Sequence, residues 1–188
     1  RQAGIACAAT VAAATASAAP IANWDYTVSS VFVTTTGATT FDGAGPTSAD
    51  GCELVSDTSI SWGACPSGPP GTGRSGIGIT NSPISGSLST DGVAKPANTY
   101  THNNNVVSSA FATLTSATIQ ATLGLKVAGS AGPYSYFTST YEILFAETPN
   151  AAPCTVTSPT PCNDIWVLDG SLNNTFTIDT TQYFFSFY

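Results

Sequence analysis

The sequence predicts an all-β protein, an antiparallel β-sandwich of jelly-roll type with an N-terminal extension that acts as an exchanged strand. Three observations predict this class. Only 8% of the 188 residues are charged, so the Glu, Lys and Arg that favour helices are scarce. Short runs rich in Thr, Val, Ile, Tyr and Phe alternate with Gly and Pro, which is typical of strands and turns. No segment of the body has the 3.6-residue period of an amphipathic helix.

The first half of the body contains four strand-like runs. Residues 26–33 are rich in β-branched and aromatic side chains, and a Gly- and Pro-containing turn cluster follows at 42–46. Residues 58–62 lead into a Pro-rich loop. Residues 76–80 alternate apolar and small side chains, although their glycines weaken a strand. Residues 84–89 form the fourth run, and the Asp-Gly pair that follows it indicates a turn.

The second half contains longer runs. Residues 109–114 and 117–127 are two runs in the middle of the chain, and the bulky apolar residues of the second share one parity. Residues 134–145 alternate in the same way. Three shorter runs close the chain, at residues 165–168, 174–179 and 182–188. Together the runs predict about nine or ten strands.

Composition also excludes several classes of protein. The formal net charge is −7 and only four residues are Lys or Arg, so the chain has no basic patch for nucleic acid. A hydrophobic share of 42% with 10% aromatic residues is enough to bury a core, which excludes disorder. The length suits one domain, and we expect no membrane span, because the longest small-residue stretch is interrupted by Thr and Ser.

Four of the five cysteines fall into two pairs within loops rich in Pro, Gly and Ser, Cys52 with Cys65 and Cys154 with Cys162. Local pairing is favoured because each pair then staples one loop, although four cysteines allow three connectivities. A zinc site is the weaker alternative, since the chain has one His and no CxxC motif. We therefore expect disulfides, no metal or other cofactor, and an extracellular or cell-surface location. Cys7 is left over, either free or paired between chains.

Residues 3–22 differ from the rest of the chain, because about half of them are alanine and none is charged. One interpretation is a secretory signal peptide, with a small-residue cleavage pattern at 16–18. Because the sequence begins without Met and includes this segment, we expect the segment to be retained. Two further alternatives are an Ala-rich helix packed on the surface and a mature protein whose N-terminus is not at Arg1.

A period of two predicts a strand for the same segment. The residues on its bulkier face are Ile5, Cys7, Ala9, Val11, Ala13 and Thr15. Such a strand builds little core, but it can complete a sheet that lacks one strand through main-chain hydrogen bonds. We expect residues 1–20 to be a donor-strand extension that inserts into a neighbouring subunit, and residues 21–188 to be the sandwich domain. A strand in the same subunit is the alternative.

Several body segments occur in an order that resembles a known family. These segments are SISWG at 59–63, NSP at 81–83, TYTHNN at 99–104, FAETPN at 145–150 and CNDIW at 162–166. In this order they resemble the THxN family of bacterial exported proteins, which usually carry a PEP-CTERM sorting tail. The motif residues are Thr101, His102 and Asn104, and the resemblance covers about residues 24–188.

The resemblance implies a surface or extracellular matrix protein, and no established activity comes with it. The sequence departs from the family pattern after Tyr188, where no PEP motif, apolar anchor or basic end follows. We therefore expect no anchoring by that route. The resemblance does not reach the Ala-rich segment at 3–22.

The sequence predicts no catalytic or metal site. His102 is the only histidine, and no nucleophile-elbow motif accompanies a serine. The Thr and Asn residues around His102 favour an imidazole that ties backbone groups together. Four acids cluster near the first Cys pair, Asp42, Asp50, Glu53 and Asp57, but they lack a calcium-loop pattern.

Two further groups of residues have both a functional and a structural interpretation. Glu142 and Glu147 straddle a predicted strand end, and nothing in the sequence indicates that they converge as a glycosidase pair. The three tryptophans, Trp24, Trp62 and Trp166, offer a platform for stacking sugars, whereas their apolar surroundings favour the core for Trp24 and Trp166.

The sequence therefore predicts a structural protein and not an enzyme. We expect a secreted subunit of a pilus-like or biofilm-matrix filament, a homopolymer in which each copy donates its N-terminal strand head-to-tail to the next copy. The alternative is a monomeric secreted sandwich that binds a matrix polysaccharide. A hydrolase dependent on His102 is a third and weaker hypothesis.

Overall fold

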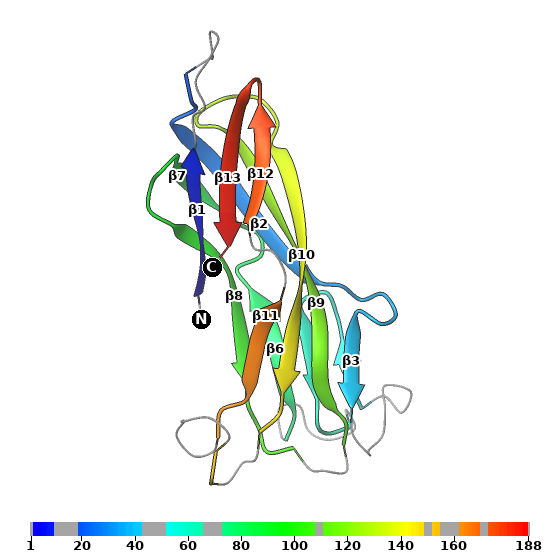
Figure 1. The fold of residues 1–188 in the computed structure, drawn as a ribbon. Helices are drawn as coiled ribbons and strands as arrows, with labels where there is room; N and C mark the ends of the chain where they lie inside the picture. Colours follow the sequence, from blue (N-terminus) through cyan, green and yellow to red (C-terminus); the bar gives the residue numbers. More distant parts are fainter. Residues whose placement is uncertain are drawn as a thin grey trace.

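The computed structural model of the chain describes residues 2–9, 19–42, 52–65, 73–107, 111–148, 152–154, 162–169 and 173–187. These residues form two antiparallel sheets and no helix (Figure 1). The all-β class and the antiparallel sandwich that the sequence predicts are therefore confirmed.

One sheet, which we call sheet A, has seven strands. In spatial order they are β12 (Asn173–Ile178), β13 (Thr181–Phe187), β1 (Gln2–Ala9), β8 (Lys95–Asn103), β6 (Ser75–Thr80), β5 (Ser59–Trp62) and β4 (Leu54–Val55). The other, sheet B, has six strands. They are β11 (Ile165–Asp169), β10 (Ser135–Ala146), β9 (Thr113–Val127), β2 (Asn23–Phe32) and β7 (Ile84–Ser89), with β3 (Thr39–Asp42) paired to β9 beside this path.

Alternating burial explains why these segments are strands. Every second side chain of β2 is buried, namely Trp24, Tyr26, Val28, Ser30 and Phe32. In β10 the buried side chains are Ser139, Tyr141, Ile143 and Phe145, while the residues between them are exposed. This period of two places one face of each strand in the core and the other face towards solvent.

Aromatic side chains from both sheets form the centre of the core. Trp24 of β2 meets Phe176 of β12 and Tyr183 of β13 edge-on, with ring centroids 6.0 and 5.1 Å apart. Trp24 is 1% exposed and Trp62 is 0% exposed, so neither forms a surface platform for sugars. Trp166 is partly buried against the same core, as its apolar surroundings predict.

Two central strands differ from the sequence prediction. The predicted runs 109–114 and 117–127 lie largely in one strand, because β9 is continuous from Thr113 to Val127 and pairs with β10, β2 and β3. The sequence did not identify β8 as a strand. Its buried side chains include the polar Asn98, so β8 lacks the apolar alternation that marks a strand in a sequence.

Candidate functional site

β1 lies between two strands that have no direct pairing in the described part of the chain. On one side it is antiparallel to β13, and on the other side it is antiparallel to β8. Figure 1 shows β1 alongside β13, near the C-terminal end of the chain. Without β1, sheet A would separate into β12–β13 and β8–β6–β5–β4. We call the facing edges of β8 and β13 the acceptor edges.

The register of β1 determines which positions belong to the core face. Ile5, Cys7 and Ala9 lie opposite Phe187, Phe185 and Tyr183 respectively. These three aromatic side chains are buried, and residues opposite each other in an antiparallel pair share a face. Positions 5, 7 and 9 therefore fall on the core face of sheet A, and positions 6 and 8 fall on the other face.

The structure contains one chain, and β1 completes the sheet of that same chain. Residues 2–9 are a strand and not an Ala-rich helix. The other predicted donor residues, Val11, Ala13 and Thr15, lie outside the described residues. Insertion into a neighbouring copy therefore stays a prediction.

Tyr183 contacts the chain at both ends of the segment that joins β1 to the domain. Ala9, the last residue of β1, pairs with Tyr183 in the register. The Tyr183 hydroxyl accepts a hydrogen bond from the backbone N of Ile21 at 2.8 Å. Ile21 makes a second hydrogen bond, because the Thr90 hydroxyl donates to its carbonyl. The start of the domain is thus anchored beside the end of β1.

Both local disulfides that the cysteine spacing favours are present. Cys52 is bonded to Cys65 and Cys154 is bonded to Cys162, with sequence separations of 13 and 8. Among the described residues, no group of three or more His, Cys, Asp or Glu side chains is arranged to hold a metal ion.

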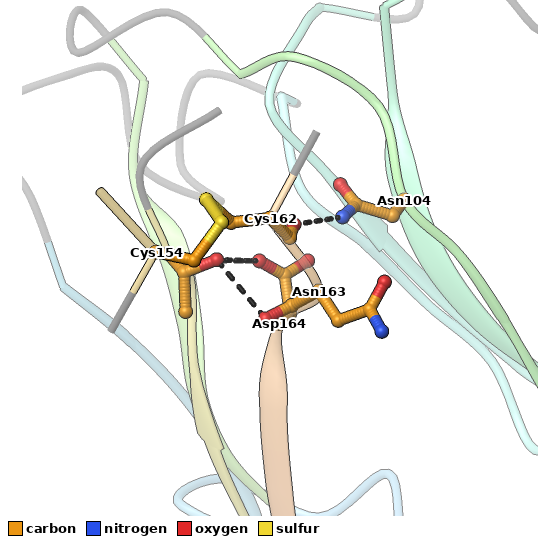
Figure 2. The surroundings of a disulfide bond; sticks show 6 residues. Asn104, Cys154, Cys162, Asn163 and Asp164 are labelled. Carbon is orange, nitrogen blue, oxygen red and sulfur yellow. Dashed lines mark hydrogen bonds between the residues drawn. A yellow bond between two sulfur atoms is a disulfide. The ribbon is translucent and has the colours of Figure 1, made fainter. Parts of the chain in front are cut away.

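The THxN motif residues lie against the second disulfide. The side-chain Nδ2 of Asn104 donates to the carbonyl of Cys162 at 3.1 Å, as Figure 2 shows beside the bond to Cys154. His102, two residues earlier on β8, has its Nε2 atom 3.4 Å from Oδ2 of Asp164. The residue between them, Asn103, is exposed. The spacing of the motif thus directs the side chains of His102 and Asn104 to residues 162–164. Thr101 is exposed on the strand.

Thr148, which follows β10 of sheet B, makes hydrogen bonds to Asn163 and Asp164. The backbone N of Thr148 donates to Oδ1 of Asp164 at 2.9 Å, and the Thr148 hydroxyl donates to the carbonyl of Asn163 at 3.1 Å. The side chain of Asp164 is 1% exposed. Asp164 therefore joins β8 of sheet A to the end of β10 in sheet B.

Trp62 and Glu147 complete this arrangement. The Trp62 Nε1 donates to Oε2 of Glu147 at 3.1 Å, and the Trp62 ring lies parallel to that of His102 with centroids 6.1 Å apart. Phe145 meets both rings edge-on. The name inter-sheet clamp is used below for Trp62, His102, Asn104, Glu147, Thr148 and Asp164.

Burial changes the proton affinity of two clamp residues. It raises the pKa of Glu147 to about 7; the hydrogen bond from Trp62 opposes this rise and the Asp164 carboxylate adds to it. Burial lowers the pKa of His102, and the Asp164 carboxylate opposes that shift. At neutral pH the imidazole is therefore neutral, and Glu147 exchanges its proton near neutrality.

The remaining acidic residues do not gather into one site. Glu142 is exposed on the outer side of β10, whereas Glu147 lies in the clamp. In the first acidic cluster Glu53 is buried and Asp57 is exposed; Asp42 ends β3, and Asp50 lies outside the described residues. Burial lowers the pKa of Arg74, and the charge of the Glu53 carboxylate opposes that change.

Comparison with protein families, curated proteins and solved structures finds no match for this chain. The resemblance to the THxN family therefore stays a prediction. In the described part of the chain, no helix is long and apolar enough to span a membrane. The sequence identified Thr101, His102 and Asn104 as motif residues, but it did not identify Asp164, Glu147 or Trp62 as their partners.

Proposed function

We propose that this protein is an exported structural subunit that polymerises by inserting β1 between the β8 and β13 strands of a neighbouring copy. The observation that carries the proposal is that β1 has a paired strand on each side, while the acceptor edges do not pair with each other in the described residues. An added strand gains affinity from main-chain hydrogen bonds on both sides and specificity from alternate side chains.

The connection between β1 and β2 is long enough for exchange. Thirteen residues, 10–22, separate Ala9 from Asn23, and extended chain spans about 40 Å over this length. That reach is comparable to the diameter of a domain of this size. The same strand can therefore complete its own sheet or that of a neighbour. Head-to-tail exchange gives an open filament, whereas reciprocal exchange gives a closed dimer.

Composition and disulfides support an extracellular structural role. Only 15 of the 188 residues are charged, so few charges lose water where subunits meet. The two disulfides favour an oxidising compartment. The resemblance of the motif segments to the THxN family of exported surface proteins agrees with this setting.

Electron microscopy of two forms of the protein tests the proposal. The full chain should form filaments in negative stain, and a form that begins at residue 19 should not. A synthetic peptide of residues 2–18 should bind the shortened form, which a calorimetric titration measures. Filaments from the shortened form would overturn the proposal, and so would a mature native N-terminus that lies beyond residue 18.

A matched pair of substitutions separates strand insertion from other effects of the segment. Ala9 falls on the core face opposite Tyr183, and Ala8 falls on the other face opposite Phe184. Ala9→Asp should abolish filaments, because it places a charge in the core, whereas Ala8→Asp should leave them intact. Equal effects of the two substitutions would contradict insertion in this register.

One observation favours polysaccharide binding as a second candidate function. Tyr136 is 64% exposed on the outer side of β10, and its ring centroid lies 6.2 Å from that of Tyr134. The Lys126 ammonium lies over Tyr134 and pairs with Asp25, so this surface suits a neutral sugar. Retardation in a gel that contains a neutral glucan, lost in Tyr136→Thr, would support this function; unchanged migration in a panel of neutral glycans would exclude it.

A further inference from the structure

The inter-sheet clamp contains buried polar atoms that have no hydrogen-bond partner. These atoms are Nε2 of His102, Oδ2 of Asp164 and Oε1 of Glu147. His102 and Asp164 are within ion-pair distance at 3.4 Å, yet neither of these two atoms makes a hydrogen bond. A buried polar atom without a hydrogen-bond partner destabilises the folded state. A change in the protonation of these atoms therefore changes the stability of the inter-sheet clamp.

The charges that face one another come from three segments. Asp164 precedes β11, Glu147 follows β10, and His102 lies on β8. Asp164 acts on both of the other groups, since its carboxylate raises the proton affinity of Glu147 and of His102. Arg74, which precedes the neighbouring strand β6, interacts electrostatically with Glu53. Among the described residues, no Lys or Arg lies within ion-pair distance of Asp164.

We propose that the protonation state of Glu147 controls the inter-sheet clamp. Residues 162–164 are held between the sheets when Glu147 is protonated, and they are loosened when Glu147 is ionised. Ionisation places a second negative charge next to the buried Asp164 while His102 is neutral. Like charges at a buried site repel, and water must enter to solvate them. Residues 162–164 then open locally without global unfolding.

The hydrogen bond from Thr148 to Asp164 is the local reporter of this state. The Thr148 residue is 5% exposed, so its backbone amide exchanges with solvent only when the clamp opens. Amide exchange, corrected for its intrinsic pH dependence, gives a protection factor for this one group. We expect the factor to fall about tenfold between about pH 6 and about pH 8 in the unmodified protein.

Substitutions separate the proposed cause from a general pH effect. Glu147→Gln keeps an oxygen acceptor for Trp62 but cannot ionise, so its Thr148 protection should not fall with pH. Asp164→Asn removes the facing charge and should reduce the fall without abolishing it, because the burial of Glu147 remains. Glu142→Gln is the matched control, because Glu142 is an exposed glutamate of β10, and it should behave like the unmodified protein.

The Thr148 protection factors of the unmodified protein and the variants can either support or refute the proposal. A fall in the unmodified protein that disappears in Glu147→Gln and persists in Glu142→Gln supports the proposal. Constant protection in the unmodified protein overturns it, and so does an undiminished fall in either Glu147→Gln or Asp164→Asn. The readout does not depend on β1, so the clamp and the proposed strand exchange succeed or fail separately.

Discussion

The Nε2 atom of His102 lies 3.4 Å from Oδ2 of Asp164, and this contact joins the two sheets. His102 belongs to β8 of sheet A, whereas Asp164 leads into β11 of sheet B. Asn104 makes a second link to the same segment through the carbonyl of Cys162. The one histidine of the chain thus has a structural place in the inter-sheet clamp.

Removal of the Asp164 carboxylate should destabilise the protein. Asp164→Ala deprives the buried Thr148 amide of its acceptor and should cost about 2–3 kcal/mol in the free energy of unfolding. Asp164→Asn retains an oxygen acceptor and should cost less. Urea denaturation measures both values. The exposed Asp169 is the control, and Asp169→Ala should change stability by at most about 0.5 kcal/mol; equal effects at the two positions would contradict the role of Asp164.

Glu147 should make stability depend on pH in a defined direction. Burial raises its pKa from 4.5 to about 7, so the folded chain retains a proton that the unfolded chain has released between these values. The contribution of Glu147 to the free energy of unfolding is therefore full below about pH 4.5 and is lost as the pH rises to about 7.

Glu147→Gln removes this loss. The variant should match the unmodified protein near pH 4.5 and exceed its stability at pH 8 by about 1–2 kcal/mol, a value reduced for the partial exposure of the group. Denaturant titrations of both proteins at several pH values give the difference directly. A difference that does not grow with pH would show that Glu147 has no raised pKa.

Asn98 should be essential for the packing of β8. Its side-chain Nδ2 donates to the carbonyls of Val28 and Asn81, and its Oδ1 accepts a hydrogen bond from the Ser30 hydroxyl. Asn98→Ala leaves these buried groups unpaired and should cost about 2–4 kcal/mol. Thermal or urea unfolding measures this loss. Asn103→Ala, at an exposed position of the same strand, should be nearly neutral, and a similar cost at both positions would refute the prediction.

The two glycines of β6 should respond differently to the same substitution. A Cβ at Gly76 would lie 2.8 Å from the backbone oxygen of Ile60, whereas a Cβ at Gly78 would meet nothing within 4 Å. Gly76→Ala should destabilise by about 1–3 kcal/mol, while Gly78→Ala should be neutral or stabilise by about 0.5 kcal/mol. Melting temperatures of the two variants provide the comparison, and a harmless Gly76→Ala would show that β5 can move aside.

Strands with apolar alternation were predictable from the sequence. In β2 and β10 the bulky residues repeat with period two, and that signal is local, because it depends only on which face of the strand is buried. The local disulfides were also favoured by spacing. β8 was missed because its inward side chains include the buried Asn98 and the partly buried His102, whose partners lie on other segments. A polar residue marks a core position only when its hydrogen-bond partners are known.

The candidate site was predictable only in part for the same reason. The THxN resemblance identified His102 and Asn104, but Asp164 lies 62 residues beyond His102 in the chain. In the sequence Glu147 is a candidate only as half of a carboxylate pair with Glu142, whereas in the structure Glu142 is exposed on β10 and Glu147 follows that strand and accepts a hydrogen bond from Trp62. No local pattern indicates that Glu147 and Asp164 face each other.

The sequence by itself determined the all-β class and the period of two in residues 2–9, and it favoured pairing of the cysteines within each loop, because each of these depends on neighbours along the chain. Only the tertiary structure decided the order of the strands, the position of β1 between β8 and β13, and the meeting of His102, Glu147 and Asp164. The physical reason is that sheet order and contacts between sheets arise from pairings between distant segments, whose energies depend on the whole fold.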